Sequence, residues 1–186
     1  RGSYQPLPIK NVDTGMGLER FVPIVQEKES ADETDLFTPL IYIVSRLCDT
    51  TRKVDSLQEQ RSMRIIVDHI RGACFLIADG ITPSKEDRGY ILRRVLRRAM
   101  RHARLICNSE NFYESLALKV IDMYSDVYPE LKEKEKLIIT TIAQEQEKFL
   151  KTLDRGVKLF EQVAANMSSR GENILSGQNA FQLYDT

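Results

Sequence analysis

The fold is decided by residues 83–106, which have the sequence PSKEDRGYILRRVLRRAMRHARLI. On a helix of 100° per residue, its apolar side chains gather on one face, namely Leu92, Val95, Leu96, Ala99, Ala103 and Ile106. Its arginines gather on the other face, namely Arg93, Arg94, Arg97, Arg98, Arg101 and Arg104. This period predicts an amphipathic helix from about Lys85 to Leu105, which packs one face and presents six guanidinium groups on the other.

The predicted helix is strongly basic within a chain that has no net charge. Residues 85–104 hold eight Lys or Arg and two acids, whereas the whole chain holds 27 Lys+Arg and 27 Asp+Glu. Like charges four residues apart on a helix repel by about 0.2–0.5 kcal/mol per pair, so the arginine face needs an anionic partner. Composition leaves two partners open: a phosphate backbone, or acids of the long helix such as Glu145 and Glu147.

The start of this helix has its own local signals. Ser84 is a candidate N-cap, and Glu86 and Asp87 would lie in the first turn, where negative charge is favourable. Asp87 therefore has a structural explanation before any functional one is considered.

The rest of the chain also has mainly helical patterns. We expect helices over 18–27, with Pro23 shortening or kinking the end, and from a cap at Asp35, with Pro39 in the first turn. Further helices are expected over 61–79 and 112–124, in a long segment that ends near Met167, and in the closing NAFQLYDT. The predicted fold class is mainly α, bundle-like, with a short N-terminal strand before the first helix.

Several site classes have no support in the sequence. The three cysteines are widely spaced in apolar surroundings, which indicates reduced thiols and a cytoplasmic location. No Cys or His cluster has the spacing of a zinc site, and His69 in VDHIR is expected to be a core histidine. No apolar run approaches the length of a membrane span, so no membrane partner is expected.

Residues 13–20, DTGMGLER, are the other stretch that could carry chemistry. The glycines allow close approach to the backbone, Asp13 could hold an ammonium group, and Arg20 would emerge in a first helical turn, where phosphate is favoured. The stretch lacks the third glycine of a dinucleotide fingerprint and the GK[ST] of a P-loop. On spacing alone a glycine-rich turn is favoured over a nucleotide site.

Five phrases taken together point to a known family. They are VDTGMGLERF, DLF, RIIVDHIRGACFLIADGITPS, RGYILRRVLRRAMRH and AFQLYDT, in that order. Together they resemble the alanyl-tRNA synthetases, which are class II aminoacyl-tRNA synthetases, over essentially the whole chain. The resemblance implies an internal fragment from motif 3 through the helical tRNA-recognition domain.

For residues 1–30, the resemblance implies the C-terminal end of the aminoacylation domain, with the strand and helix of motif 3. Arg20 and Gly17 would bind ATP, and Asp13 and Gly15 would bind alanine. Motifs 1 and 2 would lie upstream, so no catalytic set is complete here, and we expect no alanine activation by the chain alone. ATP acts with Mg in the full enzyme, and the zinc-binding editing domain would follow LYDT, so no metal site is expected here.

For residues 31–186, the resemblance implies a helical domain that recognises the acceptor stem of tRNA(Ala), including a G·U pair. The family's recognition positions fall on Asp87, Arg98 and Asp185, and Arg94, Arg97 and Arg101 are further candidates for RNA binding. Asp87 stands where the family has Asn. An ionised carboxylate only accepts hydrogen bonds, so it could accept from the guanine amine but could not donate to uracil.

The implied activity is that of an alanine–tRNA ligase, with ATP, alanine and tRNA(Ala) as partners of the full enzyme. The alternative is a non-catalytic helical interaction module whose arginine face binds acidic proteins.

Overall fold

The computed structural model describes residues 5–48, 57–106 and 112–185. Of residues 184 and 185 it describes only the backbone. Its helices are α1 (Leu18–Val25), α2 (Thr38–Leu47), α3 (Leu57–Ala78), α4 (Asp87–Ile106), α5 (Phe112–Tyr124), α6 (Pro129–Glu133), α7 (Glu135–Ser169) and α8 (Gly177–Asp185). A short 3-10 turn, Ala31–Glu33, lies between the first two. The mainly α prediction is confirmed.

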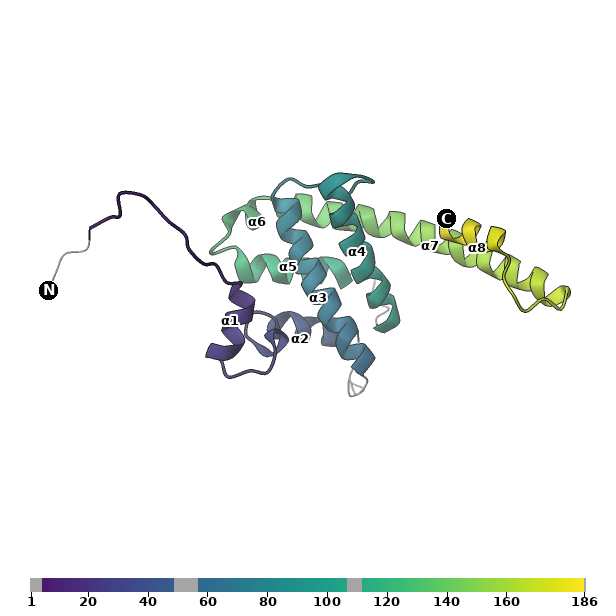
Figure 1. Ribbon diagram of the computed structural model, residues 1–186, viewed down its shortest axis with the longest axis horizontal. Helices are drawn as coiled ribbons and strands as arrows, with labels where there is room; N and C mark the ends of the chain where they lie inside the picture. The colour runs from purple at the N-terminus through teal and green to yellow at the C-terminus, as the bar shows by residue number, and fades with distance from the viewer. Residues whose placement is uncertain (1–4, 49–56, 107–111, 186) are drawn as a thin grey trace.

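Helix α3 forms the centre of the core. It packs against α2, α4, α5, α6 and α7 (Figure 1). Its apolar residues recur every three to four positions, so Ile66, Ile70, Ala73, Cys74 and Ile77 are all buried along one side. The helix ends before Gly80, whose φ of 86° is a left-handed conformation that favours glycine.

Helix α7 is much longer than the core that it packs against. It has 35 residues, and its buried positions are Ile138, Thr141, Ile142, Glu145 and Val163. The first part of α7 therefore packs against the core, while the second part extends away from it (Figure 1). Helix α8 folds back along this second part and packs on it.

The expected N-terminal strand is not present in the described residues. Residues 5–17 form an extended arm without strand pairing. A strand needs a partner for its backbone hydrogen bonds, and the described residues contain no second strand to provide one. Helix α1 follows at Leu18 and ends at Val25, two residues after Pro23, close to the predicted span.

Two predicted helix caps are wrong. Helix α2 begins at Thr38 with Phe37 as its N-cap residue, and the Asp35 carboxylate accepts a hydrogen bond of 2.6 Å from Gln26 Nε2 rather than capping the helix. Helix α4 begins at Asp87, and Ser84 is not its N-cap. The Ser84 hydroxyl instead bonds within its own loop, donating to the Glu86 carbonyl at 2.7 Å.

No helix in the described ranges is both long enough and apolar enough to cross a membrane.

Candidate functional site

The two faces of α4 lie mostly as the sequence predicts, although Val95 and Ile106 on the apolar face and Arg93 and Arg97 on the basic face are all partly buried. Leu92, Leu96, Ala99, Met100 and Ala103 are buried against the core. On the opposite side, the side chains of Arg94, Arg98, Arg101 and Arg104 are exposed. Of the six arginines of the predicted basic face, only Arg94, Arg98 and Arg101 are called the arginine face from here on. Within the described part of the chain, no carboxylate forms an ion pair with any of these three, so their charges are available to a ligand.

Arg97 has a different role from its neighbours. Its Nε donates to Glu145 Oε1 at 2.6 Å, and Glu145 is only 3% exposed. The internal ion pair expected for Glu145 is therefore confirmed, and it ties α4 to α7. The same expectation is wrong for Glu147, which pairs with Lys151 of its own helix at 2.6 Å. Arg97, predicted to bind RNA, is largely committed to the fold.

A basic cleft of about 400 Å³ lies between α4 and α7, and loop residues 83–85 also line it. Its charged lining consists of Lys85, Arg93, Arg97, Lys148, Lys151, Arg155 and Glu145. Sequence reasoning missed the α7 cations of this cleft, because the long helix has a mixed composition. The spacing of these residues could have indicated the cleft. Lys151 follows Lys148 by three residues and Arg155 follows Lys151 by four, which places all three on one helical face.

Asp87 lies in a second hollow, formed by the loop that precedes α4. This hollow, of about 430 Å³, is lined by residues 80–82 and 84–89. Asp87 is exposed and has a φ of 50°, a left-handed conformation that Asp and Asn adopt more readily than most residues. Ser84 and Lys85 line both the hollow and the basic cleft, so the two are neighbours.

Gly89 fixes the shape of this loop. A Cβ at this position would lie 2.4 Å from both the Ser84 hydroxyl oxygen and the Thr82 carbonyl oxygen. The Ser84 amide donates to the Gly89 carbonyl at 3.1 Å across the same contact. Only glycine allows the loop to approach α4 this closely.

The predicted tRNA-binding residues are spread over two helices. Asp87 and Arg98 lie on α4, eleven residues apart, which is about 16 Å along the axis. Asp185 closes α8, and its side chain lies outside the part that the structure describes. Figure 1 shows that the C-terminal end of α8 points back along α7 toward the core.

The residues of the opening motif lie at the start of α1. Asp13, Gly15 and Gly17 are exposed in the arm, and Gly17 is the N-cap residue of α1. The Arg20 amide donates to the Gly17 carbonyl at 3.0 Å, which places Arg20 in the first turn, as predicted. None of the residues of α1 is buried.

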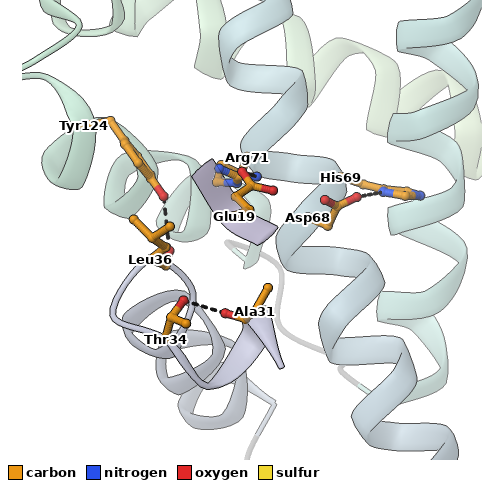
Figure 2. Close-up of polar contacts among 8 residues, drawn as sticks. All are labelled: Glu19, Ala31, Thr34, Leu36, Asp68, His69, Arg71 and Tyr124. Atoms are coloured by element: carbon orange, nitrogen blue, oxygen red, sulfur yellow. Dashed lines mark hydrogen bonds and ion pairs between the residues drawn. The ribbon is translucent and has the colours of Figure 1, made fainter. Parts of the chain in front are cut away.

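An ion pair links α1 to the central helix. Arg71 of α3 pairs with Glu19, the neighbour of Arg20 (Figure 2). The Arg71 guanidinium also lies 4.6 Å from the centre of the Phe37 ring. Burial alone would lower the pKa of Arg71, but the hydrogen bond and charge of Glu19 raise it, and the net pKa is raised. Arg71 therefore stays charged and anchors the helix that carries Arg20.

The two histidines lie close to the arginine face but do not form a metal site. His69 Nδ1 lies 2.8 Å from Asp68 Oδ2 (Figure 2), and His102 Nδ1 lies 3.0 Å from Ser62 Oγ. Burial lowers the pKa of His102, and the positive charges of Arg98 and Arg101 lower it further. Among the residues in the described ranges, no three His, Cys, Asp or Glu side chains group closely enough to hold a metal ion.

Comparison with known families gives these surfaces a context. A family model described as tRNA synthetases class II (A) matches residues 1–186. The chain belongs to this family. Similar proteins named alanine–tRNA ligase include those of Halalkalibacterium halodurans (45% identical over 186 residues), Lactococcus lactis subsp. lactis (44% over 186) and Bacillus velezensis (41% over 185). Each comparison covers all of this chain and 21% of the relative, so the chain spans about a fifth of its relatives' length.

Within this class II synthetase chain, the structure brings some candidate residues together and separates others. Arg94, Arg98 and Arg101 share one exposed face of α4, and Asp87 lies at the start of the same helix. Asp13, Gly15 and Gly17 lie in the exposed N-terminal arm, and Arg20 lies in the first turn of α1, the helix that Arg71 holds through Glu19. The synthetase chain therefore carries two separate candidate sites, one at α1 and one along α4 and α7.

Proposed function

We propose that the chain is part of an alanine–tRNA ligase, and that residues 31–186 bind the acceptor stem of tRNA(Ala). The observation that carries the proposal is the arginine face of α4. Three exposed arginines have no ion-pair partner in the described structure, on a helix whose opposite face is fixed in the core. Guanidinium forks match phosphate geometry, and the names of the relatives specify a tRNA substrate for those proteins.

Recognition of bases would fall to residues at the edges of this face. Arg98 can donate to base acceptors from the middle of α4, while Asp87 can accept from the guanine amine of a G·U pair. The wide minor groove of A-form RNA is accessible to side chains of this kind. Asp185 would contribute a further acceptor from α8, which folds back toward the core (Figure 1).

Residues 1–30 would contribute to the aminoacylation site of the full enzyme. Arg20, exposed in the first turn of α1, suits an ATP phosphate, because helix N-termini favour negative charge. The Asp13 carboxylate suits the ammonium group of alanine, and Gly15 and Gly17 leave room beside the backbone. Magnesium would enter with ATP, and we assign it no ligand from the described residues. A cytoplasmic location stays a prediction.

The test is binding of an acceptor-stem minihelix, with G·U or G·C at the third base pair. The unmodified chain should bind with a strong dependence on salt and should prefer G·U. Arg98→Ala should weaken binding about 10-fold or more, the effect of about 1–3 kcal/mol expected for loss of a base contact. Arg46→Ala is the matched control, because Arg46 is an exposed arginine on α2.

Asp87→Asn tests the departure from the family pattern in the same assay. If Asp87 takes part in recognition, the Asn variant should change the ratio between G·U and G·C affinities. Equal affinity for both pairs in both proteins would remove the recognition role assigned to Asp87. If the unmodified chain binds no minihelix even at low salt, the RNA-binding role of these helices is wrong, and an acidic protein partner becomes the better explanation.

A further inference from the structure

The basic cleft holds more positive charge than the fold itself uses. Its lining contains six cationic side chains and a single carboxylate, Glu145, which is already paired with Arg97. The remaining five cations have no second acid in the cleft lining. A concentration of like charge in one cleft is unfavourable unless an anion occupies it.

The existing contacts of these cations are weak enough to exchange. Lys151 pairs with Glu147, but the two side chains are 68% and 67% exposed, and such pairs contribute little to stability. Arg93 lies with its guanidinium 5.7 Å from the centre of the Tyr90 ring, which orients the charge without neutralising it. An incoming phosphate can therefore bind these groups without disrupting the core.

The lining indicates which kind of anion fits. It contains no aromatic side chain and only one apolar residue, Pro83. Cores of protein–protein interfaces are rich in aromatic residues and poor in lysine, so the cleft does not have their composition. Phosphate contacts, in contrast, come chiefly from Lys, Arg and hydroxyl groups, and Ser84 and Thr152 also line the cleft.

We infer that this cleft is a second RNA contact, which holds backbone phosphates of the acceptor stem beside the base pairs recognised at α4. The inference rests on the proposed function and extends it to α7. Lys148, Lys151 and Arg155 supply the α7 side, and Lys85 joins the cleft to the hollow at Asp87. Contacts of this kind fix the position of the stem without distinguishing its sequence.

The test compares two triple variants that remove the same charge. The cleft variant carries Lys148→Gln, Lys151→Gln and Arg155→Gln. The control variant carries Lys28→Gln, Lys119→Gln and Lys132→Gln. Lys119 pairs with Asp122 and Lys132 pairs with Glu135, as Lys151 pairs with Glu147. The minihelix affinity of each protein is measured from about 50 to 200 mM salt, for both G·U and G·C stems.

The cleft variant should bind at least 10-fold more weakly, equally for both stems, and its plot of log K against log salt should be shallower by about 2–3. The control variant should lose much less affinity and keep its slope. If the two triple variants behave alike while the unmodified chain still prefers G·U, the inference is wrong and the proposed function stands. If the unmodified chain binds no minihelix, both are wrong. If poly-glutamate of equal charge displaces the minihelix as well as RNA does, the assignment to a phosphate backbone is overturned.

Discussion

Replacement of Gly89 by alanine tests the loop that carries Lys85 and Asp87. The new Cβ would lie 2.4 Å from the Thr82 carbonyl oxygen, which is backbone and cannot rotate away. Ordinary contact begins near 3.4 Å, so loop and helix must separate by about 1 Å. Overpacking of this kind costs about 1–3 kcal/mol, and loss of the Ser84–Gly89 backbone hydrogen bond adds about 1 kcal/mol.

Alanine also favours a helix over glycine by about 0.5–1 kcal/mol, which offsets part of this cost. We therefore expect Gly89→Ala to lower the free energy of unfolding by about 1–3 kcal/mol in urea denaturation. Gly72→Ala and Gly156→Ala are matched controls, because both glycines are helical and no atom lies within 4 Å of the added Cβ. These two should stabilise the chain by about 0.5–1 kcal/mol.

The same variant links stability to RNA binding. Under conditions where Gly89→Ala is still folded, a displaced loop should weaken minihelix binding, whereas Gly72→Ala should bind as the unmodified chain does. If Gly89→Ala is as stable as the two controls, the close approach of loop and helix does not exist, and the geometry assigned to the Asp87 hollow is wrong.

Three further predictions concern single side chains. Arg97→Ala should lower the free energy of unfolding in urea by about 3 kcal/mol, because it leaves the Glu145 carboxylate buried without its cation. The double variant Arg97→Met/Glu145→Leu should regain most of that loss. If the single and the double variant are equally stable, the ion pair is contradicted. Burial raises the pKa of the Cys74 thiol to about 12, so iodoacetamide at pH 8 should label the Cys74 peptide only in urea, as judged by mass spectrometry. The hydrogen bond with His69 lowers the pKa of Asp68. The ionised Asp68 carboxylate therefore stabilises the fold above about pH 4, and this stabilisation is lost as the pH falls through the lowered pKa. In Asp68→Asn, the free energy of unfolding should therefore fall less steeply as the pH is lowered below about 4. An unchanged dependence on pH would count against the Asp68–His69 hydrogen bond.

Much of the helical core could be predicted from the sequence. The period of apolar residues placed α3 and α4 within a few residues and α5 at its observed ends, because each helix buries a continuous stripe. Helix starts were less predictable, because tertiary contacts compete with local ones. Asp35 has the chemistry of a cap, but Gln26, nine residues earlier, holds its carboxylate.

Of the candidate site along α4 and α7, only the side that lies within α4 could be predicted from the sequence. The arginine face follows from a single period and needs no knowledge of neighbouring helices. The cleft needs the packing of α4 against α7, and no local pattern specifies which face of α7 meets α4. The commitment of Arg97 to Glu145 rather than to a ligand follows from the same packing.

The length of α7 has a consequence for how its amide protons exchange with solvent. The helix is about 52 Å long, yet beyond Glu145 only Val163 is buried. Amides in the first three turns should exchange only through global unfolding, while those in the second half should exchange by local opening at much lower free energy. Lys148, Lys151 and Arg155 lie where protection should begin to fall. A ligand that bridges them to α4 would extend slow exchange outward along the helix.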